Sequence, residues 1–147
     1  MSSVERRTSA SPAAVWSVLA DGWTFAAWVV GASRVRAVEP GWPGAGTHVH
    51  HSVGTWPTVL DDNTAVIESE ENRRLVLQAR TRPVGQARVE ITLTPDGDGT
   101  MISMAEDFVS GPATLVPKPA RQAALVLRNK ETLHRLALMA ERRDRPE

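Results

Sequence analysis

Six short stretches of alternating apolar and polar residues follow one another between residues 33 and 108. They cover residues 33–39, 47–53, 64–70, 74–82, 87–94 and 100–108. Alternation with a period of two is typical of β-strands. None of the breaks reaches the dozen or more residues that a parallel crossover needs, so these strands have to be antiparallel. This constraint limits the chain to folds built around one antiparallel sheet.

The residues before these strands predict one more strand and two short helices. Residues 2–9 are short and charged, which is typical of an edge strand. Ser11 followed by Pro12 predicts the start of a helix over 11–20, because serine caps helix N-termini and proline suits the first helical position. A second short helical segment is predicted over 21–28.

The residues after the strands predict one long helix over 120–143. This segment has no Gly or Pro in 24 positions, and its apolar residues recur every three or four residues. Three arginines at its end, Arg142, Arg143 and Arg145, complement the helix dipole.

These elements predict an α+β fold in a single domain over residues 1–147. A twisted sheet of seven strands curls, and its concave face has to be covered by apolar surface. The long C-terminal helix is the one element available, so the curved antiparallel sheet is expected to wrap around it. Because the strands carry little aromatic bulk, we expect a cavity between sheet and helix. The length of 147 residues suits one core.

Composition narrows the function further. The chain has no cysteine, which excludes disulfides, thiolate metal ligands and thiol nucleophiles. Basic and acidic residues balance at 17 each, so a nucleic-acid partner is not expected. No apolar run approaches the roughly 20 residues that membrane insertion needs, and no signal peptide is visible, which predicts a cytoplasmic location. No phosphate-binding glycine motif is present, and His48 and His50 lack a third ligand, so neither cofactor nor metal is predicted.

Several motifs along the chain resemble those of the SRPBCC superfamily, the START-like helix-grip proteins, and within it the polyketide cyclase/dehydrase-like branch. The matching pieces are Ser11-Pro12-Ala13-Ala14-Val15-Trp16, Trp28, Gly46, Trp56-Pro57, residues 74–80 and residues 106–112. The resemblance implies a helix-grip fold with a hydrophobic pocket for a lipid, a polyketide or another apolar molecule. It leaves binding, transport and catalysis open, because the fold hosts all three.

Two titratable residues are candidates for chemistry in such a cavity. His51 shares a strand face with Val49 and Val53, so it points inward if that face is concave, where it could act as a general base. Glu106 shares a face with Met104 and Phe108, and burial would raise the pKa of its carboxyl group. The alternatives are a hydrogen-bonded histidine without chemistry and a structural or solvent-facing glutamate.

A buried Glu106 would need a partner, and Arg80 is one candidate. Its strand pattern places Arg80 with Val76 and Gln78, opposite the leucine face that should point inward. The sequence therefore leaves the partner of Glu106 open. The predicted ligand-binding residues are Trp23, Trp28, Trp56, Arg80, Met104, Phe108, Asn129 and Leu133.

The predicted function is binding of a hydrophobic small molecule between the sheet and the C-terminal helix. The alternative is a cyclase or dehydratase that uses Glu106 or His51 to remove a proton beside a carbonyl. A third alternative is a partner-regulated or oligomeric module, for which a homodimer is one assembly state. The sequence does not decide whether the protein is an enzyme.

Overall fold

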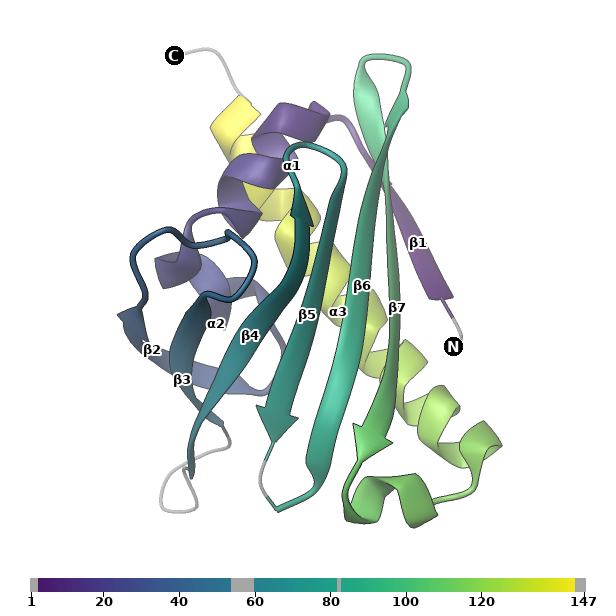
Figure 1. The fold of residues 1–147 in the computed structure, drawn as a ribbon. Coiled ribbons are helices and arrows are strands. Elements are labelled where there is room, and N and C mark those ends of the chain that lie inside the picture. The colour runs from purple at the N-terminus through teal and green to yellow at the C-terminus, as the bar shows by residue number, and fades with distance from the viewer. Residues whose placement is uncertain (1–2, 54–59, 82, 145–147) are drawn as a thin grey trace.

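The computed structural model describes residues 3–53, 60–81 and 83–144. A strand comes first, followed by two short α-helices with a 3-10 turn between them, then six strands, a second 3-10 turn and one long helix (Figure 1). The strands are β1 (Ser3–Thr8), β2 (Ala32–Val38), β3 (His48–Val53), β4 (Leu60–Glu70), β5 (Arg74–Thr81), β6 (Gly85–Asp96) and β7 (Gly99–Ser110). The helices are α1 (Pro12–Leu19), η1 (Gly22–Thr24), α2 (Phe25–Trp28), η2 (Pro112–Leu115) and α3 (Lys118–Asp144).

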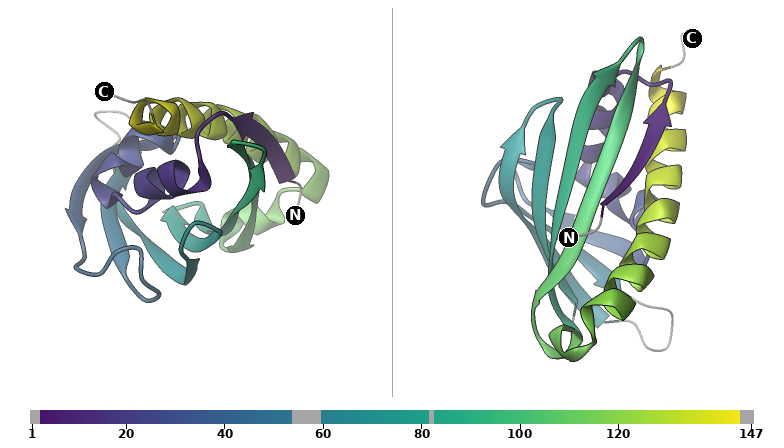
Figure 2. Two further views of the ribbon diagram at one scale, coloured as in Figure 1. Left: turned by 90° about the horizontal axis from the view of Figure 1, so that it is seen from above. Right: turned by 90° about the vertical axis from the view of Figure 1, so that its right-hand side faces the viewer.

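All seven strands form one antiparallel sheet in the order β1-β7-β6-β5-β4-β3-β2. The first strand therefore pairs with the last, and Val4 lies opposite Met104. The sheet curls around α1 and α3 when it is seen from above (Figure 2). The predicted α+β fold, with a curved sheet gripping the C-terminal helix, is confirmed.

The core lies on the concave face of this sheet. Residues of one parity on each strand point toward the helices, as Leu75 and Leu77 of β5 and Ile102 and Met104 of β7 do, and all four are buried. The C-terminal half of α3 covers this face with Leu133 and further buried residues. Helix α3 contacts α1, α2, β1 and β7. This one helix therefore connects the two short α-helices with the β1–β7 edge of the sheet.

Helix α1 begins where the sequence predicts. The Ser11 hydroxyl accepts a hydrogen bond from the Ala14 amide at 3.1 Å, and Pro12 occupies the first turn. This cap satisfies one of the amide donors that a helix N-terminus leaves unpaired.

The elements differ from the sequence-based expectation mainly at their ends. Strand β4 begins at Leu60, four residues before the predicted start, because the polar residues 61–63 pair with β3. Strands β6 and β7 also extend by one or two residues at each end. The bridge before α3 contains the short helix η2, which the sequence did not predict. No described helix is long and apolar enough to cross a membrane.

Substitutions of two leucines of α3, one buried and one exposed, test how this helix packs on the sheet. Leu133 is 1% exposed and Leu127 is 74% exposed. We expect Leu133→Ala to lower the free energy of unfolding by about 2–5 kcal/mol, because it leaves a cavity in the core. Leu127→Ala should change it by less than about 0.5 kcal/mol. Urea unfolding followed by circular dichroism measures both, and equal losses in the two variants would contradict this packing of α3.

Candidate functional site

A pocket opens between the concave face of the sheet and the helices. Its walls come from α2, the connection from α2 to β2, the inward residues of β3 to β7, and α3. It contains about 670 Å³ of space free of protein atoms, including the part that opens to solvent. Most of its lining is apolar, and Leu77, Val89, Ile91, Met104 and Phe108 belong to it. Such concave apolar lining with a few polar groups is the usual form of a small-molecule site.

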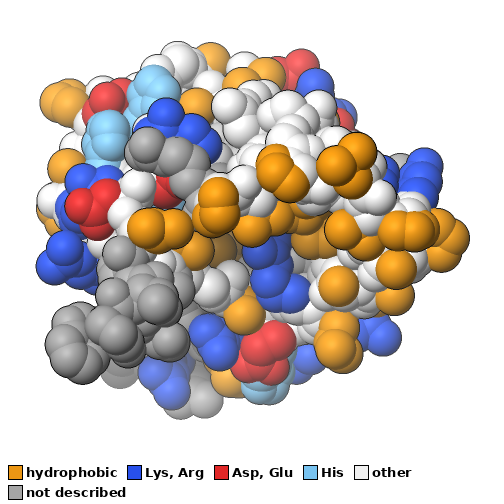
Figure 3. All heavy atoms as spheres, turned by 90° about the horizontal axis from the view of Figure 1, so that it is seen from below, with side chains coloured by type: hydrophobic (Ala, Val, Ile, Leu, Met, Phe, Trp, Pro, Cys, Tyr) orange, Lys and Arg blue, Asp and Glu red, His pale blue; other side chains and the backbone are white. Residues whose placement is uncertain are grey.

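Strands β5 and β7 end, and strand β6 begins, at the lower end of the sheet (Figure 1). Gly85 and Gly111 meet there with positive φ angles, and a Cβ on either would collide with the backbone beside the other. The Ala113 amide donates a hydrogen bond to the Val84 carbonyl at 2.9 Å, which ties η2 to the β5–β6 turn. Apolar side chains gather on this face with basic ones among them (Figure 3). Val84, Val109, Leu115 and Val116 are exposed on these elements.

Three rings form one wall of the pocket. Phe25 stacks on His51 with ring centroids 5.0 Å apart, and its other neighbour is Trp28, in an edge-on contact at 5.5 Å. All three side chains are at most 4% exposed. Sequence reasoning placed Trp28 here and missed Phe25, because Phe25 stands in a short helix without a clear period.

His51 is a buried, neutral histidine. Its Nε2 lies 2.9 Å from the Thr64 hydroxyl, and its Nδ1 has no hydrogen-bond partner among the described residues. Burial lowers the pKa of His51 to about 4; the nearby Asp62 carboxylate opposes this shift, and the Arg36 guanidinium adds to it. The imidazole therefore carries no charge at neutral pH and can accept or donate one further hydrogen bond.

Glu106 points into the pocket, as its strand parity predicts, and is 2% exposed. Its partner is Arg128 of α3, whose guanidinium Nη2 donates to the Glu106 Oε1. Arg128 also lines the pocket. Sequence reasoning missed Arg128, although it stands one helical turn before Thr132, which lines the pocket as well. The two charges neutralise each other inside an otherwise apolar wall.

The next residue of β7 makes the same kind of contact outside the pocket. The two Asp107 carboxylate oxygens accept hydrogen bonds from Arg121 of α3 at 2.7 and 3.1 Å. These bonds lower the pKa of Asp107 to about 2. Two successive acidic residues of β7 are therefore each held by an arginine of α3, seven residues apart.

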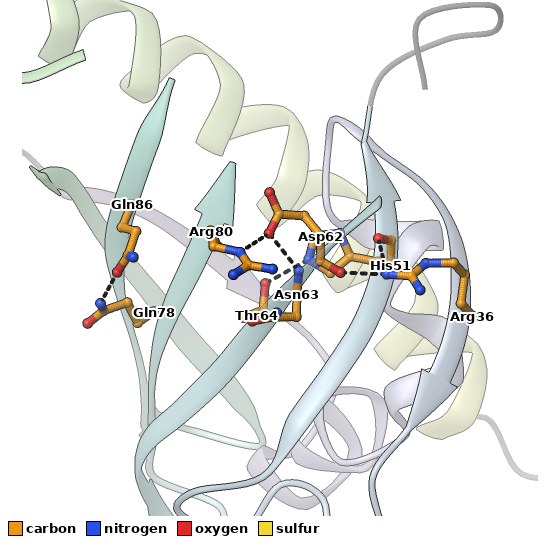
Figure 4. Close-up of polar contacts among 8 residues, drawn as sticks. All are labelled: Arg36, His51, Asp62, Asn63, Thr64, Gln78, Arg80 and Gln86. Atoms are coloured by element: carbon orange, nitrogen blue, oxygen red, sulfur yellow. Dashed lines mark hydrogen bonds and ion pairs between the residues drawn. The ribbon is translucent and has the colours of Figure 1, made fainter. Parts of the chain in front are cut away.

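Arg80 does not contact Glu106, so Arg80 as the partner of Glu106 is wrong. The Arg80 Nε instead donates to the Oδ1 of the buried Asp62 at 2.5 Å (Figure 4). Asp62 stands opposite His51 in the pairing of β3 with β4. Arg36 reaches the same corner and donates to the carbonyl oxygens of His51 and Asp62 at 3.3 and 3.0 Å. These polar contacts hold the strand ends beside the pocket.

The predicted ligand-binding residues differ in where the structure places them. Trp28, Met104 and Phe108 line the pocket, whereas Arg80 does not. Trp23 is 62% exposed in η1 and is not part of the lining, since η1 lies beyond the wall that α2 forms. Asn129 and Leu133 are buried on the seam of α3 but outside the lining, because that side of the helix packs into the core. Trp56 lies outside the described residues.

The histidines 48 and 50 share one carboxylate on the outer part of β3. The Glu39 oxygens lie 2.8 Å from the His48 Nδ1 and 3.2 Å from the His50 Nε2. Within residues 3–53, 60–81 and 83–144, no group of three or more acidic, histidine or cysteine side chains could hold a metal ion. The structure thus offers no candidate metal centre in this part of the chain.

Comparisons with known proteins address the fold and the family. The model of a family described as polyketide cyclase / dehydrase and lipid transport matches residues 2–141. A search of curated proteins finds no match.

Three solved structures share the fold at low identity. CV1439 from Chromobacterium violaceum is 18% identical, with a TM-score of 0.71 over 99% of this chain and 98% of that chain. The di-domain ARO/CYC StfQ from the steffimycin biosynthetic pathway is 12% identical, with a TM-score of 0.73 over 97% of this chain and 50% of that chain. Ara h 8.0201 is 12% identical, with a TM-score of 0.74 over 96% of this chain and 97% of that chain.

The low pKa of His51 predicts a pH dependence of stability. Between pH 6.5 and 4 the unfolded chain binds a proton at His51 and the folded chain does not. The free energy of unfolding should therefore fall as the pH drops through this window, by about 1.4 kcal/mol per pH unit. His51→Gln should flatten this dependence, whereas His134→Gln, which alters a half-exposed histidine of α3, should leave it in place. Urea titrations at several pH values measure it; an unchanged slope in His51→Gln would contradict the assignment.

Proposed function

The chain belongs to the polyketide cyclase / dehydrase and lipid transport family, and we propose that it binds a hydrophobic small molecule in the pocket between sheet and α3. The single observation that supports this function best is the apolar lining of that pocket. Core packing normally fills such space, because interiors are close-packed. A retained apolar hollow beside a wall of three rings is suited to an apolar guest.

The ligand class in this proposal is a lipid, a polyketide or a similar molecule. The similar structures support only the fold, since they are at most 18% identical among those described above. The choice of ligand therefore depends on the pocket residues of this chain. The space of about 670 Å³ includes the part that opens to solvent, so an enclosed ligand has less room than this.

A cyclase or dehydratase activity is the second candidate, and one observation favours it. His51 is uncharged at neutral pH and lines the pocket, and its Nδ1 has no hydrogen-bond partner in the described part of the chain. A base that removes a proton beside a carbonyl requires such a free nitrogen. Glu106 is less suited to this role, because its carboxylate already accepts a hydrogen bond from Arg128. A homodimer and a cytoplasmic location remain predictions from the sequence.

Filling the pocket should abolish binding. Ala79 of β5 lines the pocket, whereas Ala65 of β4 belongs to the outer parity of its strand and does not. Both are half-buried. We expect Ala79→Phe to weaken binding of 1-decanol at least tenfold, because the ring occupies ligand space, while Ala65→Phe leaves the affinity within a factor of two. Isothermal titration calorimetry measures both affinities.

Native mass spectrometry of the purified protein, followed by denaturing extraction, looks for a co-purified ligand. An empty protein that also fails to bind fatty acids, fatty alcohols and aromatic ketones would contradict the proposed function. Equal binding by the Ala65→Phe and Ala79→Phe variants would show that the ligand lies elsewhere.

The enzymatic alternative makes a separate prediction. If the protein is an enzyme, His51→Ala and Glu106→Gln should each lower turnover at least a hundredfold, because each removes a proton-transfer group or its neighbour in the pocket. If it is a carrier, the same changes should alter ligand affinity only modestly. Product formation from a poly-β-ketone substrate, followed by liquid chromatography, measures turnover. Unchanged product formation in both variants would exclude the acid–base assignment.

A further inference from the structure

The charged and polar groups of the pocket determine which ligand head group it can bind. Among the described lining residues, Arg128 is the one cation and Glu106 the one anion, and they are bound to each other. His51 is uncharged at neutral pH. The pocket therefore presents no net charge to a ligand.

Arg128, the one cation among the described lining residues, already donates to Glu106 through its Nη2, although its Nε has no hydrogen-bond partner there. A carboxylate that approached Arg128 would lie beside Glu106, which is 2% exposed and has Arg128 as its hydrogen-bonding partner. Two anions on one guanidinium repel each other, and the repulsion is less screened on the side of the buried Glu106 carboxylate than in open solvent. Displacing Glu106 would leave a buried charge without a partner, which is more costly still.

Two neutral hydrogen-bonding groups of the lining remain unsatisfied. Among residues 3–53, 60–81 and 83–144, the Trp28 Nε1 donor has no hydrogen-bond partner, and the His51 Nδ1 has none either. Both side chains are at most 3% exposed, and both contact Phe25 on the same wall. Unpaired buried polar groups are costly, and a ligand oxygen that accepts from the Trp28 indole would remove one of them.

We infer that the pocket selects an uncharged apolar molecule with a carbonyl or hydroxyl oxygen at the Trp28–His51 wall, and discriminates against the matching carboxylate. This inference rests on the proposed function and names the chemical class of its ligand. The Glu106–Arg128 pair is the element that discriminates, because it occupies the cation of the pocket.

Size-matched ligand pairs test this selection in the wild-type protein. The pairs are 1-decanol with decanoate and 2-acetonaphthone with 2-naphthoate, titrated calorimetrically at pH 7.5, where both acids are ionised. We expect the neutral member of at least one pair to bind at least tenfold more tightly than its anion. Anions that bind as tightly as their neutral partners in both pairs would overturn the inference and leave the proposed function standing. Binding of no member of either pair, nor of a wider apolar panel, would overturn both.

Glu106→Gln tests the mechanism of the selection. The amide cannot neutralise Arg128, so the guanidinium becomes available to a carboxylate, and the preference should move at least tenfold toward the anion. Asp107→Asn is the matched control, because it removes the neighbouring carboxylate of β7, which pairs with Arg121 outside the pocket. Its ligand preference should match the wild type. A Glu106→Gln variant that folds, by circular dichroism, and keeps the wild-type preference would overturn the role of the ion pair.

Trp28→Phe tests the oxygen contact without altering any charge. It keeps an aromatic ring in the wall and removes the indole donor. We expect 2-acetonaphthone to lose at least fivefold in affinity, whereas 2-ethylnaphthalene, which has the same shape without the oxygen, should lose less than twofold. Equal losses for the two compounds would overturn the proposed contact. If Glu106→Gln does not fold, this comparison and the wild-type pairs still decide the inference.

Discussion

The structure depends on one helix covering the concave face of a sheet. Seven antiparallel strands that twist this strongly leave a hollow lined by apolar side chains, and that surface has to be removed from water. Helix α3 does this with buried residues from Gln122 to Ala140, and it contacts the sheet near both of its ends. Near its end, the Glu141 carboxylate accepts a hydrogen bond from the Thr8 hydroxyl of β1 at 2.6 Å. Nearer its start, Arg121 binds Asp107 of β7.

The pocket exists because this covering is unequal along the helix. In the C-terminal half of α3, Leu133, Leu136 and Ala140 are buried in the core cluster together with residues of α1. In the preceding turns, Arg128 and Thr132 face the sheet instead, and α2 supplies only one short wall of rings. The pocket lies beside these turns of the helix. Core and binding site are thus two ends of the same interface.

The sequence predicted the strands well, because a strand has only two faces and parity decides between them. On β7 this rule placed Glu106 in the pocket correctly. A helix offers no such rule, because the side chains of successive residues point about 100° apart around the helix axis. Asn129 and Arg128 are neighbours, yet only Arg128 reaches the pocket. Trp23 could not be placed either, because no periodicity acts in the short segment η1. The sequence did not predict Arg128 as the partner of Glu106 for the same reason, because Arg128 lies on the helix, 22 residues further along the chain.

The two acidic residues of β7 show how one contact acquires a second role from its surroundings. Glu106 and Asp107 both bind arginines of α3, and both therefore fix the helix on the sheet. Asp107 binds its arginine outside the pocket lining, so this ion pair does not affect the charge that a ligand in the pocket meets. Glu106 does it inside the lining, where the same pair decides how much free charge a guest meets. A purely apolar residue at position 106 would leave the Arg128 guanidinium exposed to the pocket and favour anions. The pair consequently contributes to the stability of the fold and to the electrostatics of the site at once, and a substitution there has to be interpreted on both counts.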